Sequence, residues 1–563
     1  MAGADGQAEV LRPFRPYHPG VPEIDEPLNQ PPPLEGYNVF EQDRALVEAV
    51  EREGASWAGD RIQAVGALAG EEAIEWGFLA NRYPPVLRTH DRFGNRIDEV
   101  EFHPAWHQLV GAGVEHGMHA LPWREPRAGS HVARGAMFIA LSQAEAGFSC
   151  PMSMTYAAVP ALRAQPHVAA EWEPRLTSTE YDARFVPAPD KRGALCGMAM
   201  TERQGGSDVS ANTSKAVPTG DGEYEITGHK WFCSAPMSDA FLVLAQAAAG
   251  LSCFLLPRFR PDGSRNGFHI DRLKDKLGNR SNASSEVRFE RAWGRLVGDE
   301  GRGVATIIEM VNHTRLDCVL GSAALTRVAV AQATHHAAHR LAFGKLLTNQ
   351  PLMRNVLADL CIESEAATVS AMRLARAYDD VREDRSAVPF VRLATAVLKY
   401  WVCKRAPAHA AEALECLGGN GYVEESGMPR LYRESPLNSI WEGSGNVICL
   451  DVLRAMQRTP ESVDAFFGEI ALAEGAEPRL DAFAAKLRDD LRAGDVRESE
   501  ARRLVERMAL ALQASLLVRH SPPEVSGTFV ASRLEGDAGL AFGTLPSSSG
   551  FTAIIDRARP ALD

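Results

Sequence analysis

The spacing of apolar residues changes along the chain and predicts which kind of element each part forms. From residue 38 to about residue 193 the apolar positions recur mostly three or four residues apart, as Phe138, Leu141 and Ala144 do. Because an α-helix turns once every 3.6 residues, this spacing places the apolar side chains on one helical face. We therefore expect an N-terminal helical domain over residues 38–193.

The pattern is different between residues 194 and 303. Short apolar or alternating stretches follow one another there, among them GALCGMAM, YEITGHKWF, FLVLAQ and CFLLPRF, with turn residues such as Asp221-Gly222 between them. This arrangement predicts a small β-barrel or sandwich. Helical spacing returns over residues 304–456 in long segments rich in alanine and leucine, which are typical of a helix bundle.

The two ends of the chain differ from the middle. Residues 1–37 are rich in proline and lack periodicity, which predicts an extended arm that lies over a neighbour. Residues 457–563 predict a helical appendix, although the last forty residues are rich in glycine and serine and give no clear pattern. The apolar faces expected in this appendix are formed by Leu480, Phe483, Leu487 and Leu491 and by Leu504, Met508, Leu512 and Leu516.

The length of the chain agrees with this division into parts. Single cores stop growing at about 250–300 residues, so a chain of 563 residues is expected to hold two to four domains. The predicted fold class is α+β and mostly α: an N-terminal helical domain, a small central β-domain, a C-terminal helix bundle, and an additional C-terminal helical domain.

Composition narrows the classes of function. The formal net charge is −13, which does not favour a generic nucleic-acid or membrane surface. The nine cysteines include no C-x-x-C pair, so neither a disulfide framework nor a structural zinc site is expected. The N-terminus lacks the apolar core of a signal peptide. No apolar run is expected to span a membrane, and we expect a cytoplasmic protein.

Two motifs lie in the predicted β-domain. The segment 200–208, MTERQGGSD, follows an apolar strand and combines two glycines with hydroxyl side chains. Such a loop suits the edge of a flavin ring or a phosphate, although a plain turn explains the stretch taken alone. The segment 228–236, GHKWFCSAP, ends a strand with aromatic side chains beside Ser234. It could pack on an isoalloxazine ring, or it could simply belong to the core.

Three further motifs lie in the predicted bundle. Arg340 in RLAFGK and Gln350 before Pro351 could reach a pyrophosphate or an adenine, or could belong to an ordinary helix end. The LGGNGY turn at 417–422 allows close contact with a dinucleotide, and a glycine-rich helix end explains it nearly as well. Glu442 in IWEGSGN lies between apolar and small residues, which would raise the pKa of its carboxyl group toward that of a general base, although a glutamate just before a helix can also be an ordinary favourable contact with the helix dipole.

Taken together and in order, these motifs resemble those of the acyl-CoA dehydrogenase superfamily. The match also includes KLGNRS at 276–281 and covers about residues 50–456. Stretches such as FHPAWH, RLKDKLGNRSNAS and RLYRESPLNSIWEGSGN, together with the helical tail of about a hundred residues, are similar to the AidB alkylation-response branch of that superfamily.

The resemblance implies a flavoprotein that binds FAD and oxidises an acyl-CoA thioester. Glu442 would remove the α-proton while flavin N5 takes the β-hydride, and Ser207 and Arg315 would contact the substrate. Arg340, Gln350 and the Gly418-Gly419 pair would hold the pyrophosphate and adenine across a subunit boundary, which implies a homotetramer. The implied cofactor-binding set is Met200, Thr201, Glu202, Gly205, Gly206, Ser207, Phe232, Ser234, Arg340, Phe343, Gln350, Gly418, Gly419, Trp441, Gly443, Ser444 and Asn446.

Departures from the usual pattern affect the expected activity. Phe232 replaces a tryptophan, Trp441 replaces a tyrosine, and Glu415 replaces a glutamine. These changes are typical of the AidB branch and imply only weak activity on short branched substrates such as isovaleryl-CoA. A nitroalkane oxidase or flavin monooxygenase on the same scaffold would typically use an aspartate base, and Glu442 argues against it.

The alternative function implied by the AidB resemblance is binding of double-stranded DNA through the C-terminal region, with protection against alkylation. Duplex binding needs clustered basic residues. Residues 457–563 hold 13 basic and 17 acidic residues, a net charge of −4, and the acidic residues interleave with the arginines. A solvated helix face with ion pairs is the interpretation that this composition favours.

A metal site is not expected. His335, His336 and His339 share a helical stretch, but no nearby carboxylate or cysteine completes a ligand set.

Overall fold

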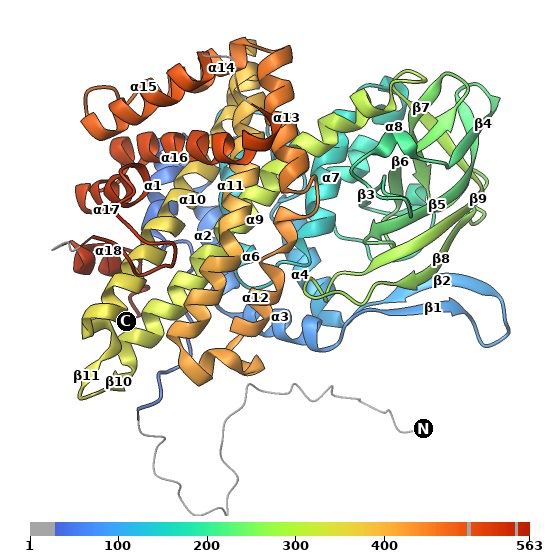
Figure 1. Cartoon of the computed structure of the whole chain (residues 1–563). Helices are drawn as coiled ribbons and strands as arrows, with labels where there is room; N and C mark the ends of the chain where they lie inside the picture. Colours follow the sequence, from blue (N-terminus) through green and yellow to red (C-terminus); the bar gives the residue numbers. More distant parts are fainter. Residues whose placement is uncertain (1–28, 493–496, 547–549, 563) are drawn as a thin grey trace, which may run out of the picture.

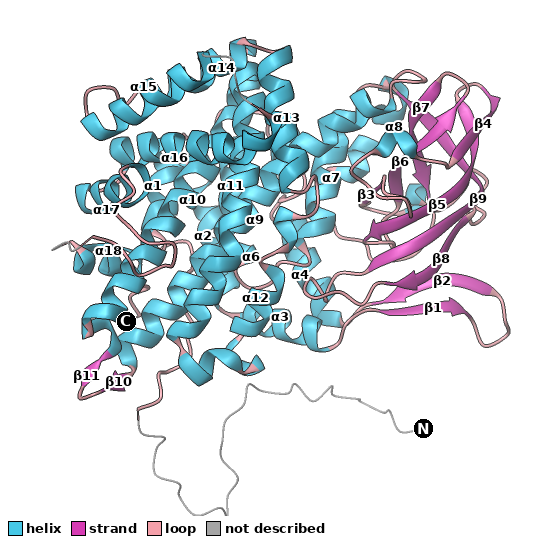
Figure 2. Cartoon of the chain, in the orientation of Figure 1, coloured by secondary structure: helices cyan, strands magenta, loops and turns pink. Residues whose placement is uncertain are grey.

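The computed structural model describes residues 29–492, 497–546 and 550–562. Helices and strands lie on opposite sides of the molecule, with the β-domain at one side and the helices filling the rest (Figure 1; Figure 2). The fold is mostly helical with a central sheet, as predicted. Three apolar cores hold it together: one among the helices, one between sheet and helices, and one inside the sheet.

The N-terminal part forms eight helices and a hairpin. The innermost helix carries the sequence SHVARGAMFIALS, and all of its residues are buried because it lies between the other helices. The helices are α1 (Arg44–Arg52), α2 (Gly59–Gly70), α3 (Glu72–Arg82), α4 (Pro104–Glu115), α5 (Leu121–Arg124), α6 (Ser130–Ser142), α7 (Ser149–Leu162) and α8 (Pro166–Leu176).

This part also contains a β-hairpin, where the periodicity led us to expect helices alone. Strands β1 (Val86–His90) and β2 (Arg96–Glu101) pair antiparallel and lie beside the sheet next to β8, where the Arg96 side chain donates to the Ile270 carbonyl oxygen. The two strands are short and half-exposed, so they add little to the apolar pattern. The helical prediction was wrong for this stretch.

The β-domain is a seven-stranded sheet whose pairings close on themselves. The strand order is β3-β6-β4-β5-β9-β7, with β8 beside β9, and β7 pairs again with β6. Strand β6 reads AFLVLAQA, and its first six residues are buried because both of its faces meet apolar neighbours. The strands are β3 (Cys196–Ala199), β4 (Lys215–Gly220), β5 (Glu223–Ser234), β6 (Ala240–Ala247), β7 (Gly250–Pro257), β8 (Phe268–Leu273) and β9 (Ser284–Val297).

Three long helices form the bundle: α9 (Gly303–His339), α10 (Pro351–Glu383) and α11 (Val388–Cys416). Helices α10 and α11 both have proline in the first turn, where the missing N–H costs no hydrogen bond. By length and composition α9 could cross a membrane, which differs from the expectation that no apolar run is long enough. However, 83% of its most apolar window is buried inside the protein, as in the core helix of a water-soluble fold.

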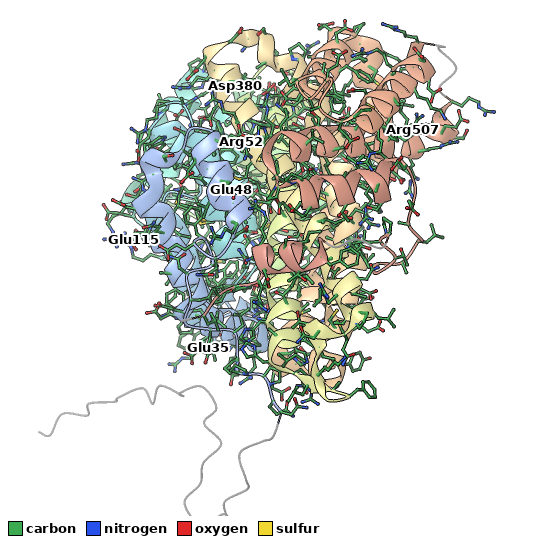
Figure 3. All side chains as sticks on the ribbon, turned by 90° about the vertical axis from the view of Figure 1, so that its left-hand side faces the viewer. Glu35, Glu48, Arg52, Glu115, Asp380 and Arg507 are labelled. Carbon is green, nitrogen blue, oxygen red and sulfur yellow. The ribbon has the colours of Figure 1, made fainter. Side chains whose placement is uncertain are left out.

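The C-terminal appendix shares the core of the bundle. The predicted apolar faces of α15 and α16 are buried or packed against that core, and the last forty residues include ordered helices where the sequence gave no pattern. Figure 3 views this side, and it labels Glu48 on α1, which pairs with Arg557 of the last helix. The bundle ends with α12 (Met428–Glu434) and α13 (Gly445–Arg458), and the helices of the appendix are α14 (Glu461–Ala471), α15 (Pro478–Arg492), α16 (Ala501–His520), α17 (Pro523–Phe529) and α18 (Phe551–Ala558).

Most of the predicted N-terminal arm, residues 1–28, lies outside the described residues. The part that follows contacts the same chain. Asn29 exchanges hydrogen bonds with Leu341 after α9, the Pro32 carbonyl oxygen lies 2.9 Å from His335 Nε2, and Leu34 is buried. Residues 29–37 therefore belong to the surface of their own subunit.

Candidate active site

A cavity of about 560 Å³ lies where the β-domain meets the bundle. Helices α6 and α7 form one wall, the ends of β3 and β5 form another, and α9 forms a third. The segment between α12 and α13 closes it and contributes Trp441, Glu442, Gly443 and Ser444. A volume of this size is within the range of about 300–1,000 Å³ that is usual for small-molecule sites.

The turn after β3 contributes Met200, Thr201, Gly206 and Ser207 to the cavity. Gly206 is required by close packing, because a Cβ atom there would lie 2.4 Å from Thr201 Oγ1. The turn is tied to the end of β5 by a hydrogen bond of 2.8 Å from the Trp231 N–H to the Thr201 carbonyl oxygen. The two motifs of the β-domain therefore meet as one surface.

The end of β5 supplies Phe232 and Ser234 to the same cavity. The Phe232 side chain is half exposed, and the Lys274 ammonium lies 4.7 Å from the centre of its ring. Ser234 Oγ is 3.1 Å from Ser284 Oγ. Lys276, which lies behind Ser284, also lines the cavity, and burial lowers the pKa of its ammonium to about 8.

Glu202, predicted to contact the cofactor, does not line the cavity. Its carboxylate is buried and accepts a hydrogen bond of 2.9 Å from Lys230 Nζ, and it also accepts hydrogen bonds from the N–H groups of Thr213 and Ser214. Burial alone would raise the pKa of Glu202, but the charge of Lys230 and these hydrogen bonds hold it well below its usual range. The residue anchors the turn from behind. Gly205, also in the predicted set, has φ +121° and lies outside the lining as well.

Glu442 lies at the bundle side of the cavity in an unusual backbone conformation. Its φ is +59°, in the left-handed region, where a residue other than glycine carries a strain of about 1–3 kcal/mol. Thr314 Oγ1 donates a hydrogen bond of 2.8 Å to Glu442 Oε2. Burial raises the pKa of the Glu442 carboxyl group, while the Thr314 hydrogen bond and the charges of Arg315 and Lys399 partly oppose that rise.

The main chain around Glu442 is held by two cations. Arg315 Nε donates to the Glu442 carbonyl oxygen at 3.0 Å, and Arg315 also pairs with Asp451 of α13 at 2.7 Å. Lys399 Nζ of α11 donates to the carbonyl oxygens of Trp441, at 2.8 Å, and of Gly443. Arg315, which the resemblance implies as a substrate contact, lines the cavity. Its hydrogen bonds, however, direct the guanidinium group toward Asp451 and the main chain of Glu442.

Sequence reasoning missed Lys399 and Thr314. Lys399 is a single cation in the apolar run LATAVLKYWVC and is 1% exposed. A lone charge in the buried stretch of a bundle helix is the signal that could have drawn attention to it. Thr314 lies one residue before Arg315, and its hydroxyl group contacts the carboxylate of Glu442.

Several predicted residues lie away from the cavity. Arg340 and Phe343 belong to the short hairpin of β10 (Leu341–Ala342) and β11 (Lys345–Leu346) that follows α9, labelled at the lower left of the helical part in Figure 1. The Phe343 side chain is 99% exposed. Gln350, Gly418, Gly419 and Asn446 also lie outside the cavity lining.

The hairpin and the glycine turn lie close together through the N-terminal segment. Arg340 donates a hydrogen bond to the Asn29 carbonyl oxygen, and Asn420, within the turn 418–422, donates to Gln30 Oε1. The residues predicted for pyrophosphate and adenine therefore form one surface region, separate from the cavity of their own chain.

Among the residues that the structure describes, no group of three or more histidine, cysteine or carboxylate side chains is placed to hold a metal ion. Within the histidine motif, His335 lies near the Pro32 carbonyl oxygen, and His339 Nδ1 is 2.8 Å from the His335 carbonyl oxygen.

Comparison with known proteins places this site in a family. The AidB N-terminal domain matches residues 29–183, the acyl-CoA dehydrogenase middle domain matches 197–292, and the acyl-CoA dehydrogenase C-terminal domain matches 301–457. AidB of Escherichia coli (strain K12) is 45% identical over 516 residues, which are 91% of this chain and 95% of the relative. The chain belongs to the AidB branch of the acyl-CoA dehydrogenase family.

Other comparisons agree with membership of the acyl-CoA dehydrogenase family. Acyl-CoA dehydrogenase family member 11 of Caenorhabditis elegans is 30% identical over 501 residues, covering 82% of this chain and 79% of the relative. Its solved structure in complex with C11-CoA superimposes with a TM-score of 0.81 at 25% identity and covers 95% of this chain and 93% of that chain. The structure described as the Bd2924 apo-form gives 0.80 at 29% identity and covers 88% and 99%. Members of the acyl-CoA dehydrogenase family are FAD-dependent.

Proposed function

We propose that this protein is an FAD-dependent acyl-CoA dehydrogenase in which Glu442 removes the α-proton of an acyl thioester. The observation that carries the proposal is the position of the Glu442 carboxyl group. It lines the same cavity as the 200–207 turn and as Phe232 and Ser234 at the end of β5. A base and a flavin-sized surface that face one space match the geometry that dehydrogenation at Cα–Cβ requires.

The residues of the β-domain fit a flavin ring. Gly206 keeps a side chain away from the turn, so backbone N–H groups and the hydroxyl groups of Thr201 and Ser207 can approach a planar ligand. Phe232 offers an aromatic face and Ser234 a hydroxyl donor. When bound, FAD would supply the acceptor for the β-hydride at its N5 atom.

The environment of Glu442 makes its carboxylate a stronger base than an exposed one. Burial disfavours the charged carboxylate and raises its pKa toward that of the carbon acid, so the driving force for proton transfer increases. Thr314 holds Oε2 and thereby fixes the direction of the side chain. Met154, Ile307, Ile308 and Val311 add apolar lining that limits access of water to the carboxylate.

We propose an acyl-CoA thioester as the substrate, with weak turnover of short branched chains such as isovaleryl-CoA. The complex of the Caenorhabditis elegans relative with C11-CoA supports the substrate class. Ser207, which the resemblance implies as a substrate contact, lines the cavity, while Arg315 would act through the main chain of Glu442.

We further propose that a second copy of the chain completes the FAD site and that the protein is a homotetramer. The surface region that includes Arg340, Phe343 and the 418–422 turn is separate from the cavity of its own chain, and Phe343 and Tyr422 are largely exposed. This arrangement supports binding of the adenine half of the cofactor of a neighbouring subunit.

Binding of double-stranded DNA remains the alternative, but several candidate arginines already have partners. Arg507, labelled in Figure 3, pairs with Asp490 at 2.5 Å, Arg497 pairs with Glu500, and Arg488 lies over the Phe467 ring. A duplex titration at low salt with the wild type and with an Arg492→Glu, Arg503→Glu variant tests this alternative. If the wild type ignores duplex DNA, the alternative fails for this chain.

The main proposal is tested with the purified protein in the presence of FAD. We expect a yellow protein whose flavin absorbance bleaches when acyl-CoA is added. Glu442→Gln should keep the bound FAD and lose the bleaching. A wild type that takes up no FAD, or a Glu442→Gln variant that bleaches at the wild-type rate, would overturn the proposal.

A further inference from the structure

Lys399 stands out because no carboxylate among the described residues lies within ion-pair distance of its buried ammonium. Its side chain is 1% exposed, and its hydrogen bonds go to the carbonyl oxygens of Trp441 and Gly443. No ion pair of Lys399 with a carboxylate is found among the described residues. Lys230, the comparable buried lysine of the β-domain, pairs with Glu202 at 2.9 Å. Burying an ammonium without a counter-ion is costly, so this position calls for an explanation.

The geometry gives that explanation. The two carbonyl oxygens that Lys399 holds belong to the residues immediately before and after Glu442, and Arg315 holds the carbonyl oxygen of Glu442 itself. Three successive carbonyl groups are therefore fixed from two helices, α9 and α11. Glu442 has φ +59° at this point, a conformation that persists only when its surroundings fix it.

Gly443 shows how little freedom the segment has. Its φ is +104°, and a Cβ atom added there would lie 2.9 Å from Ile448 Cδ1. The chain must thus turn sharply before α13 starts at Gly445, and without a donor at residue 399 the carbonyl oxygens of Trp441 and Gly443 would lose these bonds. A segment that is both strained and held in place keeps its side chain in one direction.

We propose that Lys399 is a positioning residue for the dehydrogenation proposed above, and that it keeps the carboxyl group of Glu442 directed into the cavity by holding the main chain on both sides. This inference rests on the proposed function. It adds a second effect, because the ammonium group also favours the charged form of the nearby carboxylate and thereby opposes the rise in its pKa that burial causes.

Other groups around Glu442 limit how large this electrostatic effect can be. Asp451 of α13 pairs with both Arg315 and Arg392, so this group of three keeps one net positive charge, and the buried thiols are neutral because burial raises their pKa values. The titratable or charged groups that surround the carboxyl group, its loop or the cavity are Cys150 of α7, Lys276 before β9, Arg315, Asp317 and Cys318 of α9, Arg392 and Lys399 of α11, Glu434 of α12, and Asp451 of α13.

The test compares Lys399→Met with Lys399→Arg in the FAD-bound protein, with Lys404→Met on the same helix as a control. Methionine keeps an unbranched side chain of similar length but has neither charge nor donor. We expect Lys399→Met to lower kcat about 100-fold with little change in KM, because small displacements of a reacting group are costly. Lys404→Met should match the wild type.

The second readout separates positioning from a merely structural role. A 3-thia-acyl-CoA analogue has sulfur in place of the β-carbon. It can lose its α-proton, but it has no β-hydride to transfer. The resulting anion therefore stays beside the oxidised flavin, and the pair absorbs at long wavelength. The intensity of this band rises with pH as Glu442 loses its proton. We expect Lys399→Met to raise the pH midpoint of that rise by about one unit. Lys399→Arg keeps the charge and should keep the wild-type midpoint.

The outcomes are distinguishable. If the wild type binds FAD but neither oxidises acyl-CoA nor deprotonates the analogue, the proposed function itself is refuted. If the wild type does both and Lys399→Met has the same kcat and the same midpoint, only the inference about Lys399 is refuted. If Lys399→Met and Lys399→Arg lose activity to the same extent while the midpoint of the folded protein stays unchanged, the inference about Lys399 is also refuted.

Discussion

The buried pair of Lys230 and Glu202 offers a direct test of how the turn at 200–208 is held. Both side chains are fully buried, and the Lys230 ammonium donates to Glu202 at 2.9 Å and to the Leu244 carbonyl oxygen at 2.7 Å. We predict that Glu202→Gln leaves this ammonium buried without a counter-charge. Breaking a buried pair by removing one partner costs about 3–5 kcal/mol.

The structure indicates which of the two substitutions is worse. In Lys230→Met the carboxylate keeps its hydrogen bonds from Thr213 and Ser214, so this change should cost less than Glu202→Gln. The double variant Glu202→Leu, Lys230→Met removes both charges and should recover part of the loss, because no unpaired ion remains. The exposed pair of Arg291 and Glu225 in the same domain serves as the control and should contribute at most about 1 kcal/mol.

Urea unfolding followed by circular dichroism measures these differences, and FAD retention by gel filtration reports on the turn. The pKa of Glu202 is lower in the folded state than in the unfolded chain. Its contribution to stability is therefore present above the unfolded pKa, near pH 4 to 5, and is lost as the pH falls toward the folded pKa. The gap between the wild type and Glu202→Gln should shrink below about pH 4. A gap of less than about 1 kcal/mol at pH 7 would contradict this reasoning.

Two further substitutions test the cavity walls. Gly206→Ala places a methyl group 2.4 Å from Thr201 Oγ1, so the turn must shift. We expect weaker FAD binding in a fluorescence titration, with little change in the urea midpoint. Unchanged affinity would show that the turn does not contact the cofactor. Thr314→Val removes the hydrogen bond that lowers the pKa of Glu442, so the rise of kcat/KM with pH should move to higher pH. A move to lower pH would contradict the role of this hydrogen bond.

Local sequence patterns predicted much of the fold because they report directly on which side chains are buried. Leu504, Met508, Leu512 and Leu516 share one face of α16, and all four are buried as predicted. The pattern could not indicate which surface this face would cover, because a helical stripe has the same spacing against any partner. The appendix was therefore predicted as a separate domain, whereas its core is continuous with that of the bundle.

The residues of the candidate site were also only partly predictable from the sequence. Gly206 and Glu442 line the cavity and belong to motifs that the sequence analysis singled out, because the residue types of those motifs point to the site. Glu202 lies in the same motif but faces away, and only the tertiary position of Lys230 decides that. Lys399 is 43 positions before Glu442 and has no motif of its own, so its contact with the segment around Glu442 is visible only in three dimensions.

The last helix, α18, has a consequence for how the chain is made. Arg557 joins Glu48 of α1 to Glu365 of α10, and Ile554 and Ile555 enter the same core as the first helices. During synthesis the N-terminal helices emerge long before residue 557 does, so the part of their apolar surface that Ile554 and Ile555 cover stays exposed until α18 has emerged. The core among the helices is therefore completed only after α18 has been made.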